Sequence, residues 1–571
     1  MKFLLKYLRP HYKIMSLGLF IKIIGTLVDL FIPYILEHLI DNVVPTGDLT
    51  KVLLFGLLMI ACALIGLIGN IIANRMASAV ARDTTAGIRS DLFRRISYLS
   101  SKQVDEITIP TLETRLTSDT YNIHHMTGMM QRLGVRAPIL LIGGIAVTLS
   151  MEPVLCLVLM CVLPLITAVV LLISKKGIPL FKNVQEKTDE MVSTVRESAQ
   201  GIRVIKALSK SDHQYKKFNK NNRALSDAEL RSGFTISLTN PLMNAFLNIG
   251  MAAVILVGAF RVNYGKAEPG MIIAFMSYFT IILNAMINLT RMFTLFSKGA
   301  ASAQRISEII DTEPDITVLE KGVKEENSAF IEFRNVNFSY NGTKNNLTDI
   351  SFKINKGQTL GIIGATGSGK STIIQLLLRF YDVSEGKILI DGNDIRTLTP
   401  SELRSKIGTV LQNDFIYAGT VLDNIDFGRS VSELDVIRAT KDAQAFGFIE
   451  ELADKFEHHI NTKGTNLSGG QKQRLLISRA LSTRPDILIL DDSSSALDYK
   501  TDSLLRSALR DNYNDATKII VAQRISSISH ADLILVIDDG KIVGSGKHGD
   551  LINTCPIYSE ISLSQIGGEA E

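Results

Sequence analysis

A glycine-rich segment at residues 364–371 has the residue types and the spacing that bind phosphate groups. It reads Gly-Ala-Thr-Gly-Ser-Gly-Lys-Ser and lies between an apolar strand predicted at 359–363 and a helix predicted at 372–379. The glycines let backbone amides converge on phosphate oxygens, Lys370 adds a positive charge, and the Ser371 hydroxyl can ligate Mg²⁺. The segment therefore predicts a nucleotide-phosphate site made by Gly364, Thr366, Gly367, Ser368, Gly369, Lys370, Ser371 and Thr372.

A second chemical signal is an apolar run that ends in carboxylates. Residues 487–490 are Ile-Leu-Ile-Leu, followed directly by Asp491 and Asp492. A buried strand that ends in a carboxylate beside a phosphate loop is the second half of a P-loop nucleotidase, where the carboxylate binds Mg²⁺ through water. Asp491 is therefore predicted to complete the metal site with Ser371.

Residues 466–471, Asn-Leu-Ser-Gly-Gly-Gln, followed by Lys-Gln-Arg, resemble the signature of ABC ATPases. The resemblance extends over the whole chain, which looks like an ABC exporter half-transporter of the multidrug-resistance-like, type IV fold. It implies ATP and Mg²⁺ as cofactors and an ATP-hydrolysing translocase. In the family, the signature faces the γ-phosphate held by the opposite subunit, so the resemblance implies a second half-transporter, with Ser468, Gly469, Gly470 and Gln471 completing the partner's site.

The resemblance assigns further positions one by one. Tyr340, at the end of Asn-Phe-Ser-Tyr, would stack on adenine. Gln412 matches the Q-loop glutamine near Mg²⁺, which adds it to the predicted metal and catalytic residues. Residues 495–498 match the D-loop, and residues 116–126 and 201–212 look like the two coupling helices that touch the ATPase domains.

Two positions depart from the pattern of active members of the family. Asp492 stands where most have Glu, and Gln523 stands where they have the switch His. The shorter carboxylate is drawn back by about one bond length from the attacking water, and Gln cannot carry a positive charge. Thr462, where many exporters carry Glu, is a milder departure. With Asp492 and Gln523, the chain resembles the degenerate subunit of a heterodimeric bacterial multidrug exporter. Such a subunit has a slow site of its own and supplies an intact signature to the partner's hydrolytic site. The alternative is a homodimer that tolerates both residues.

The elements that must position these residues fall into two unlike halves. The chain has 571 residues, 46% apolar and 21% charged, with a mean hydropathy of +0.20. This composition excludes a disordered chain. We predict an α-helical six-span transmembrane domain at 1–300, a linker at 301–328 and an α/β ABC ATPase domain at 329–571. The six runs, each compared with about 20 residues per crossing, are 15–36, 52–74, 137–151, 154–174, a span within 232–260, and 269–290.

Charge patterning indicates the partners and the orientation. The net charge of +4 is too small a bias for a nucleic-acid surface. The four cysteines form no CxxC pair and are interpreted as core residues. The chain before the first span carries four basic residues and no acid, so the positive-inside rule places both termini in the cytoplasm of a multi-pass cell-membrane protein. We expect this membrane to be a bacterial plasma membrane.

The substrate has to be inferred from the spans. We expect an amphipathic, drug-like compound, with a lipid or peptide exporter and an ATP-gated channel or sensor as alternatives. Asp29 would either meet a cationic substrate or form an ion pair, because an acid within a span faces a wet cavity or a partner. An apolar stripe in the last span would either line the cavity or pack the bundle: Phe275, Tyr278, Phe279, Ile282 and Met286.

Overall fold

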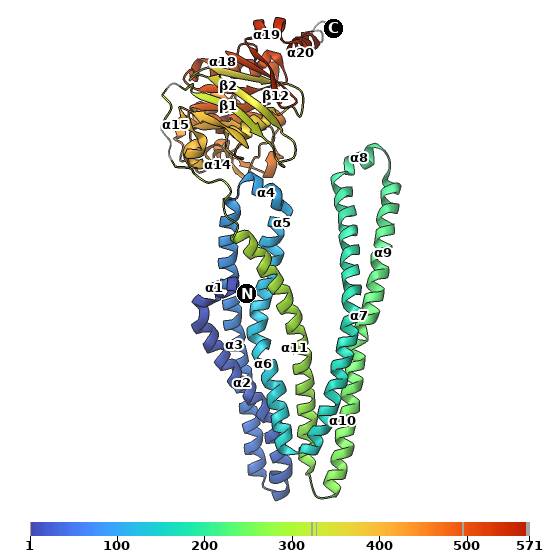
Figure 1. Ribbon diagram of the computed structural model, residues 1–571. Helices are drawn as coiled ribbons and strands as arrows, with labels where there is room; N and C mark the ends of the chain where they lie inside the picture. Colours follow the sequence, from blue (N-terminus) through green and yellow to red (C-terminus); the bar gives the residue numbers. More distant parts are fainter. Residues whose placement is uncertain (1, 321–323, 327, 494–495, 567–571) are drawn as a thin grey trace. The chain divides into compact units, whose positions relative to one another are not determined.

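The computed structural model describes residues 2–320, 324–326, 328–493 and 496–566 (Figure 1). These residues form two compact units. The first contains the chain up to Ser97 together with Pro110–Thr312, and the second contains Tyr98–Ile109 together with the described residues from Glu313 onward. The first unit is entirely helical and the second is built on β-sheets, in line with the two halves that the composition predicts.

The first unit is a bundle of very long helices. Helices α2, α3, α6 and α11 pack together, and the hairpin of α7, α9 and α10 joins them through α6 and α11 (Figure 1). The helices are α1 (Lys2–Leu8), α2 (Tyr12–His38), α3 (Leu49–Ser97), α5 (Ile109–Thr114), α6 (Thr120–Met151), α7 (Pro153–Gln200), α8 (Ile202–Ala207), α9 (Ser211–Ser237), α10 (Thr239–Asn263) and α11 (Pro269–Ile310).

Five helical stretches in the described residues are long and apolar enough to cross a membrane. They are Lys2–Thr46, Leu49–Ser97, Ile109–Met151, Ser211–Asn263 and Pro269–Ile310. The predicted fourth crossing falls in α7, whose apolar part Pro153–Val169 is shorter than these five. The count of six spans, like the domain boundaries at 300 and 328, stays a prediction.

Polar side chains fix how the helices begin and turn. The Asp41 carboxylate accepts from the backbone N–H groups of Gly270 (2.6 Å) and Met271 (3.0 Å), which caps the first turn of α11 with a negative charge. Between α6 and α7 the extended residue Glu152 is followed by Pro153, the tight reversal that the sequence predicts. The Arg261 guanidinium donates to Glu152 at 2.7 Å and ties this reversal to α10.

The aromatic stripe of the last span packs inside the bundle. Phe275, Tyr278, Phe279 and Ile282 are each at most 1% exposed. The Tyr278 hydroxyl donates to the Leu30 carbonyl at 2.6 Å, which joins α11 to α2. Of the two interpretations of this stripe, packing is the one that Phe275, Phe279 and Ile282 fit.

The chain reverses between α3 and α6 earlier than the sequence analysis predicts. The predicted coupling segment 116–126 is part of a continuous helical run, first the π-helical turn Arg115–Asp119 and then α6. The break instead falls at Tyr98–Ile109, which contains the short helix α4 (Ser101–Ile107). Ser100 caps α4, since its side chain accepts from the Gln103 N–H while the Gln103 side chain accepts from the Ser100 N–H. This capping box was a readable signal that the sequence analysis missed.

The second predicted coupling segment, 201–212, contains the short helix α8 between α7 and α9. Gly201 ends α7, and its N–H donates to the Glu197 carbonyl at 2.8 Å. The segment therefore forms the tip of a helical hairpin, and its role as a coupling helix stays a prediction (Figure 1).

The second unit contains an antiparallel sheet and a mostly parallel one. The four-stranded sheet has the order β2-β1-β4-β5 and the six-stranded sheet the order β12-β11-β3-β10-β9-β6. The strands are β1 (Ile331–Phe338), β2 (Leu347–Ile354), β3 (Thr359–Ile363), β4 (Glu385–Ile390), β5 (Asn393–Asp394), β6 (Ile407–Val410), β9 (Ile487–Asp491), β10 (Thr517–Val521), β11 (Leu533–Asp538) and β12 (Lys541–Gly546), with a separate pair β7 (Gly419–Thr420) and β8 (His459–Ile460).

Helices cover both faces of the parallel sheet, as they must when its strands are apolar on each side. Ile487, Leu488 and Ile489 of β9 are fully buried, and their side chains divide between two clusters on opposite faces of the sheet. The helices are α12 (Lys370–Leu377), α13 (Pro400–Arg404), α14 (Val421–Asp426), α15 (Glu433–Asp442), α16 (Phe446–Glu450), α17 (Gly469–Leu481), α18 (Tyr499–Asn512), α19 (His548–Thr554) and α20 (Pro556–Ile566).

Candidate nucleotide site

Four neighbouring parallel strands end at one edge of the large sheet, and their ends carry the predicted chemistry. Strand β10 lies between β3 and β9, and β6 pairs with the other side of β9. The phosphate loop follows β3, the two aspartates end or follow β9, Gln523 follows β10 and Gln412 follows β6. Because the carboxyl ends of parallel strands meet at one edge, residues as far apart in the chain as Thr366 and Gln523, 157 positions, become neighbours.

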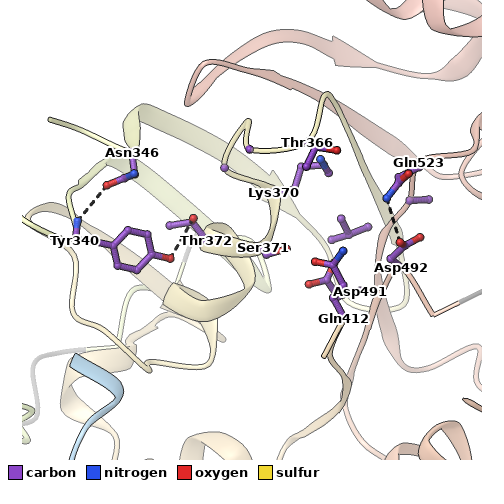
Figure 2. Close-up of a pocket in the computed structure, with 14 residues that line it drawn as sticks. Tyr340, Asn346, Thr366, Lys370, Ser371, Thr372, Gln412, Asp491, Asp492 and Gln523 are labelled. Atoms are coloured by element: carbon purple, nitrogen blue, oxygen red, sulfur yellow. Dashed lines mark hydrogen bonds between the residues drawn. The ribbon is translucent and has the colours of Figure 1, made fainter. Parts of the chain in front are cut away.

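These residues line one pocket of about 290 Å³ (Figure 2). The predicted residues in its wall are Tyr340, Thr366, Gly367, Gly369, Lys370, Ser371, Thr372, Gln412, Asp491, Asp492 and Gln523. Asn346, Val521 and Ala522 also line it and were missed by the sequence analysis. Gly364 and Ser368 belong to the loop but not to the wall of the pocket.

The phosphate loop depends on glycine at two points. Gly369 has φ 106°, in the left-handed region, immediately before α12 begins. A Cβ on Gly364 would lie 2.0 Å from the Ile537 carbonyl oxygen, so no other residue fits between the loop and β11. The Ser368 hydroxyl is buried and has no hydrogen-bond partner among the described residues. The loop therefore holds a polar group that a bound phosphate can satisfy.

Lys370 lies across this loop. Its ammonium donates to the carbonyl oxygens of Gly364 (2.9 Å) and Ala365 (2.7 Å), which holds the charge over the loop. Burial lowers the pKa of Lys370, while the nearby charges of Asp491 and Asp492 oppose that shift. A phosphate oxygen brought to this position would receive a donor that is already placed and partly stripped of water.

The metal-binding residues predicted for this site lie together. Burial raises the pKa of Asp491, and a hydrogen bond with the Ser371 side chain opposes the shift. Gln412 lines the same pocket from β6 (Figure 2). A carboxylate, a hydroxyl and an amide oxygen are the hard oxygen ligands that Mg²⁺ takes, together with phosphate oxygens and water. The donor set therefore fits Mg²⁺ bound with a nucleotide.

Asp492 and Gln523, the two departures from the family pattern, contact each other. The Gln523 Nε2 donates to the Asp492 Oδ2 at 3.1 Å (Figure 2). The Asp492 backbone N–H donates to the Val521 carbonyl at 2.9 Å, and its φ of 49° is in the left-handed region, where Asp is tolerated better than most residues. Burial raises the pKa of Asp492. The pair therefore forms one small polar unit on the side of the pocket away from Tyr340.

The loop that carries Gln523 is held from behind by the C-terminal helix. The Gln565 side chain of α20 donates to the Gln523 carbonyl at 2.8 Å and accepts from the Ile525 N–H at 2.8 Å. The sequence alone gave no signal for this contact, because it joins residues 42 positions apart through side-chain to backbone bonds. Gln565 is thus a positioning residue for the switch segment.

Tyr340 lies on the opposite side of the pocket and comes from the end of β1. Its backbone N–H donates to the Asn346 side chain at 3.1 Å, and its hydroxyl donates to Thr372 at 3.2 Å (Figure 2). The ring packs edge to face on Tyr381, with centroids 5.1 Å apart. These contacts fix an aromatic wall one helical turn from the phosphate loop.

Helix α4 contributes to the surroundings of this aromatic wall. The Tyr381 hydroxyl donates to Asp105 at 2.5 Å, and the Gln103 side chain donates to the Glu313 carbonyl at 2.6 Å. These residues all belong to the second unit. Segment 98–109, which follows α3, is therefore linked to Tyr340 through Tyr381: Asp105 accepts from the Tyr381 hydroxyl, and the Tyr381 ring packs on Tyr340.

The signature residues lie elsewhere, at the start of α17. Ser468 is the N-cap residue, its side chain accepting from the Gln471 N–H (3.3 Å) while the Gln471 side chain accepts from the Ser468 N–H (2.9 Å). Gly469 and Gly470 form the first turn, and a Cβ on Gly469 would meet nothing within 4 Å. This helix start does not line the phosphate-loop pocket, and the backbone amides of a first helical turn are groups of the kind that bind anions. Of the predicted D-loop, Ser495 lies outside the described residues, and Asp498 caps α18.

Two family models match the chain. The ABC transporter transmembrane region matches residues 15–286, and the model described as ABC transporter matches residues 347–495. The first covers the apolar half and the second covers the phosphate loop, the signature and the Asp491 strand. The two matches agree with the division into helical and α/β units.

Whole-length relatives have the same arrangement. The chain is 33% identical over 570 residues to an uncharacterized ABC transporter ATP-binding protein of Mycobacterium tuberculosis, covering 98% of this chain and 97% of that protein. It is 31% identical over 568 residues to one of Bacillus subtilis, covering 99% and 98%. Among solved structures, a bacterial Atm1-family ABC exporter with ATP bound matches with a TM-score of 0.83 and 25% identity, over 97% of this chain and 99% of that one.

Proposed function

The chain belongs to the ABC transporters, as a membrane-embedded, ATP-hydrolysing exporter with the Atm1-family fold, and from this premise we propose that it is one half of a heterodimer that exports amphipathic compounds. In this proposal the chain's own phosphate loop holds ATP at a slow site. Its signature completes a fast site on a different half-transporter that carries Glu and His at the two positions lacking here. Transport is out of the cytoplasm, across the cell membrane.

The contact between Asp492 and Gln523 carries the proposal. Both departures fall in one pocket, and the 3.1 Å hydrogen bond between them engages the groups that would polarise water and sense the γ-phosphate. A misplacement of about 1 Å in a catalytic group can cost on the order of a hundredfold in rate. The binding residues Tyr340, Lys370 and Asp491 are unaffected by these changes, which supports a site that binds well and hydrolyses slowly.

ATP binding at this site follows from the residues already described. Adenine stacks on the Tyr340 wall, the backbone amides of the loop and Lys370 receive the phosphates, and Ser371 with Asp491 and Gln412 hold Mg²⁺. When bound, Mg²⁺ neutralises the charge of the β- and γ-phosphates. Lys370 then exchanges its two loop carbonyls for phosphate oxygens, which adds a charge-assisted bond in place of neutral ones.

The need for a second chain is supported by the position of the signature. The start of α17 is an anion site, yet it does not line the pocket of its own chain. ABC exporters work as dimers, in which each γ-phosphate lies between one chain's loop and the other's signature. Because Ser468 and Gly469 keep the family residues, the partner's site receives an intact signature from this chain.

Coupling to the helical unit is assigned to α4 and α8. Both are short helices between long ones, and α4 belongs to the second unit, where Asp105 and Gln103 bond to Tyr381 and to the Glu313 carbonyl. We infer that closure of the two ATPase domains on ATP moves these helices and turns the substrate cavity outward. The basic N-terminal segment, with Lys2, Lys6, Arg9 and Lys13, places both termini on the cytoplasmic side in this proposal.

Purification of the chain alone and together with candidate partners tests the proposal. We expect weak ATPase activity from the chain alone and substrate-stimulated activity from the pair. Full stimulated activity from the chain alone would establish the homodimer alternative. ATP-dependent accumulation of an amphipathic dye in inside-out vesicles separates export from a channel or sensor, which would show no uphill accumulation.

A further inference from the structure

A group of charged side chains lies among helices α2, α3 and α6, with Lys22 buried and the Arg136 side chain 39% exposed. The Lys22 side chain is 2% exposed, and its ammonium donates to Asn74 of α3 at 3.0 Å. The Arg132 guanidinium of α6 donates to Ser78 of α3 at 2.7 Å. In the described part of the chain, neither cation has an acidic residue within ion-pair distance.

The one acid of this group is already paired. The Asp29 Oδ2 lies 3.1 Å from the Arg136 Nη2 and accepts from Asn70 at 3.5 Å. Its other oxygen packs against Gly66, where a Cβ would lie 2.5 Å away. Asp29 therefore fits the ion-pair alternative of the sequence analysis, and its carboxylate is not free to receive a cationic substrate.

The charges of the group do not balance. Lys22, Arg132 and Arg136 carry three positive charges and Asp29 carries one negative charge, which leaves +2. Lys22 lies within electrostatic reach of the other three. The Nε atoms of Arg132 and Arg136 are buried and have no acceptor among the described residues. Unbalanced charge and buried donors without an acceptor both cost free energy, so this cation cluster is short of an anion.

An apolar groove lies further along α2 and α6, toward their C-terminal ends. Its volume is about 370 Å³, within the range of ligand pockets, about 300–1,000 Å³. On α6, Gly143 follows Arg136 by seven residues, which places it about 10 Å further along the same helix face. The groove is lined by Leu27, Leu30, Phe31, Tyr34, Gly143, Ala146, Val147, Ser150 and Tyr278.

We propose that the cation cluster and this groove bind an amphipathic anion, with its acidic headgroup at Lys22, Arg132 and Arg136 and its apolar tail along α2 and α6. The acidic group supplies the missing negative charge and the acceptors for the two Nε atoms. The tail runs toward the C-terminal ends of α2 and α6. That the bound compound is then exported rests on the proposed function. The inference narrows the class of exported substrates from amphipathic compounds to amphipathic anions.

A matched pair of probes tests the proposal without ATP. The full-length protein in phosphatidylcholine nanodiscs is titrated with dansylaminoundecanoic acid and with its methyl ester, and binding is followed by dansyl fluorescence. At a pH where the acid is ionised, we expect it to bind at least about tenfold more tightly than the ester. Equal affinity of acid and ester would overturn the proposal.

Two double variants separate net charge from packing. K22M/R132Q removes two cations and brings the net charge of the cluster to zero, so the ratio of acid to ester affinity falls to about one. E152Q/R261Q removes an ion pair elsewhere in the bundle and leaves the cluster at +2, so the ratio stays within about threefold of that of the unaltered protein. Preservation of the ratio in K22M/R132Q would overturn the proposal. R261Q, which alters an arginine paired with Glu152 elsewhere in the bundle, controls for loss of a membrane arginine.

Two further comparisons identify the source of the anion and separate this proposal from the proposed export function. If the site holds an acidic bilayer lipid, phosphatidylglycerol in the nanodisc displaces the probe; if it holds a transported compound, the affinity for the probe is unchanged. Both results support an acidic headgroup site. Because these titrations measure equilibrium binding, failure of ATP-dependent transport would count against the proposed function and leave the anion site standing.

Discussion

The phosphate-loop pocket and the start of α17 lie in one ATPase domain, but they depart from the family pattern to different degrees. The pocket combines an ordinary set of binding residues with two altered catalytic positions, Asp492 and Gln523. The signature has no alteration, and its capping box is complete on both sides. In the proposed heterodimer, the chain therefore keeps the signature that its partner's site would need for hydrolysis and lacks two residues that its own site would need.

The largest expected effect is at the signature. Gly469→Asp introduces a negative charge at the first residue of α17, where a γ-phosphate of the partner's site would lie. Since a Cβ at Gly469 meets nothing within 4 Å, the variant should fold, and an acid is even favourable at a helix start. We expect ATP turnover of the assembled transporter to fall at least about a hundredfold in a steady-state ATPase assay.

The matched control for this variant is Gly447→Asp. Gly447 lies in the first turn of α16 and also has open space around its Cβ position. This control should leave turnover within about twofold, as for an ordinary surface substitution. Asp492→Asn should change turnover less than about threefold, because its site contributes little to the total. A larger loss from Asp492→Asn than from Gly469→Asp would reverse the proposed division between the two regions.

The second expected effect is a gain of activity in the phosphate-loop pocket. Asp492→Glu with Gln523→His restores a longer carboxylate and a titratable partner, and we expect hydrolysis at this site to rise about tenfold. The gain is limited because the φ of 49° at Asp492 suits Asp better than Glu, at a cost of about 1 kcal/mol.

This gain is measured with the partner's own catalytic Glu replaced by Gln, so that only one site turns over. Gln523→His alone serves as the control, since it supplies the charge without moving the carboxylate. An unchanged rate in the double variant would mean that the two residues are not what slows this site.

The residues of the phosphate-loop pocket and of the signature at the start of α17 were also the ones that the sequence predicted best, for a physical reason. Phosphate binding requires glycines, a lysine and a hydroxyl within eight consecutive residues, so the loop is readable without any tertiary structure. Asp491 was readable because the strand before it is apolar on both faces. The sequence also predicted the helical and α/β halves and the reversal at Glu152, because span length and turn chemistry are local.

Contacts that depend on how elements pack were not readable. Asn346 and Gln565 reach the site by side-chain to backbone bonds from other parts of the chain, and no periodicity marks them. The charges of Lys22 and Arg136 were visible, but their partners depend on the register of three helices. The first coupling segment was assigned by resemblance to the family pattern, and the capping box at Ser100, which marks the short helix α4, was not used.

A third and smaller effect concerns the positioning of the switch segment. Gln565→Ala removes the two bonds that hold the loop of Gln523 from behind. We expect kcat at the restored site, in the D492E/Q523H background, to fall about threefold while the KM for ATP is unchanged, because the loop contacts the reacting phosphate but Tyr340 and Lys370 bind the nucleotide.

Gln565→Glu is the conservative comparison, since it keeps the acceptor for the Ile525 N–H but loses the donor to the Gln523 carbonyl. In the D492E/Q523H background, its kcat should lie between that of the protein with Gln565 and that of the Gln565→Ala variant. A rise in KM with unchanged kcat would assign Gln565 to nucleotide binding and remove it from the switch.

The smallest effect on turnover is expected from a charge that lies in neither region. Glu332 of β1 is 1% exposed and accepts from Arg334 at 2.6 Å, while Lys353 lies 3.1 Å away. The hydrogen bonds from Arg334 lower the pKa of Glu332 from an ordinary 4.5 to about 2. Burial opposes this shift, and Lys353 adds to it. A lowered pKa in the folded state means that the carboxylate stabilises the fold above pH 4.5, and that this contribution is lost as the pH falls from 4.5 to about 2.

Glu332→Gln should therefore lower the free energy of unfolding at neutral pH by about 2 kcal/mol and flatten the acid limb of the stability curve in chemical denaturation. Its ATP turnover should stay within about twofold, because a loss of stability above the folding threshold does not alter either nucleotide-binding region. If Glu332→Gln lowered turnover as much as Gly469→Asp, the signature effect would have to be attributed to stability instead of phosphate binding.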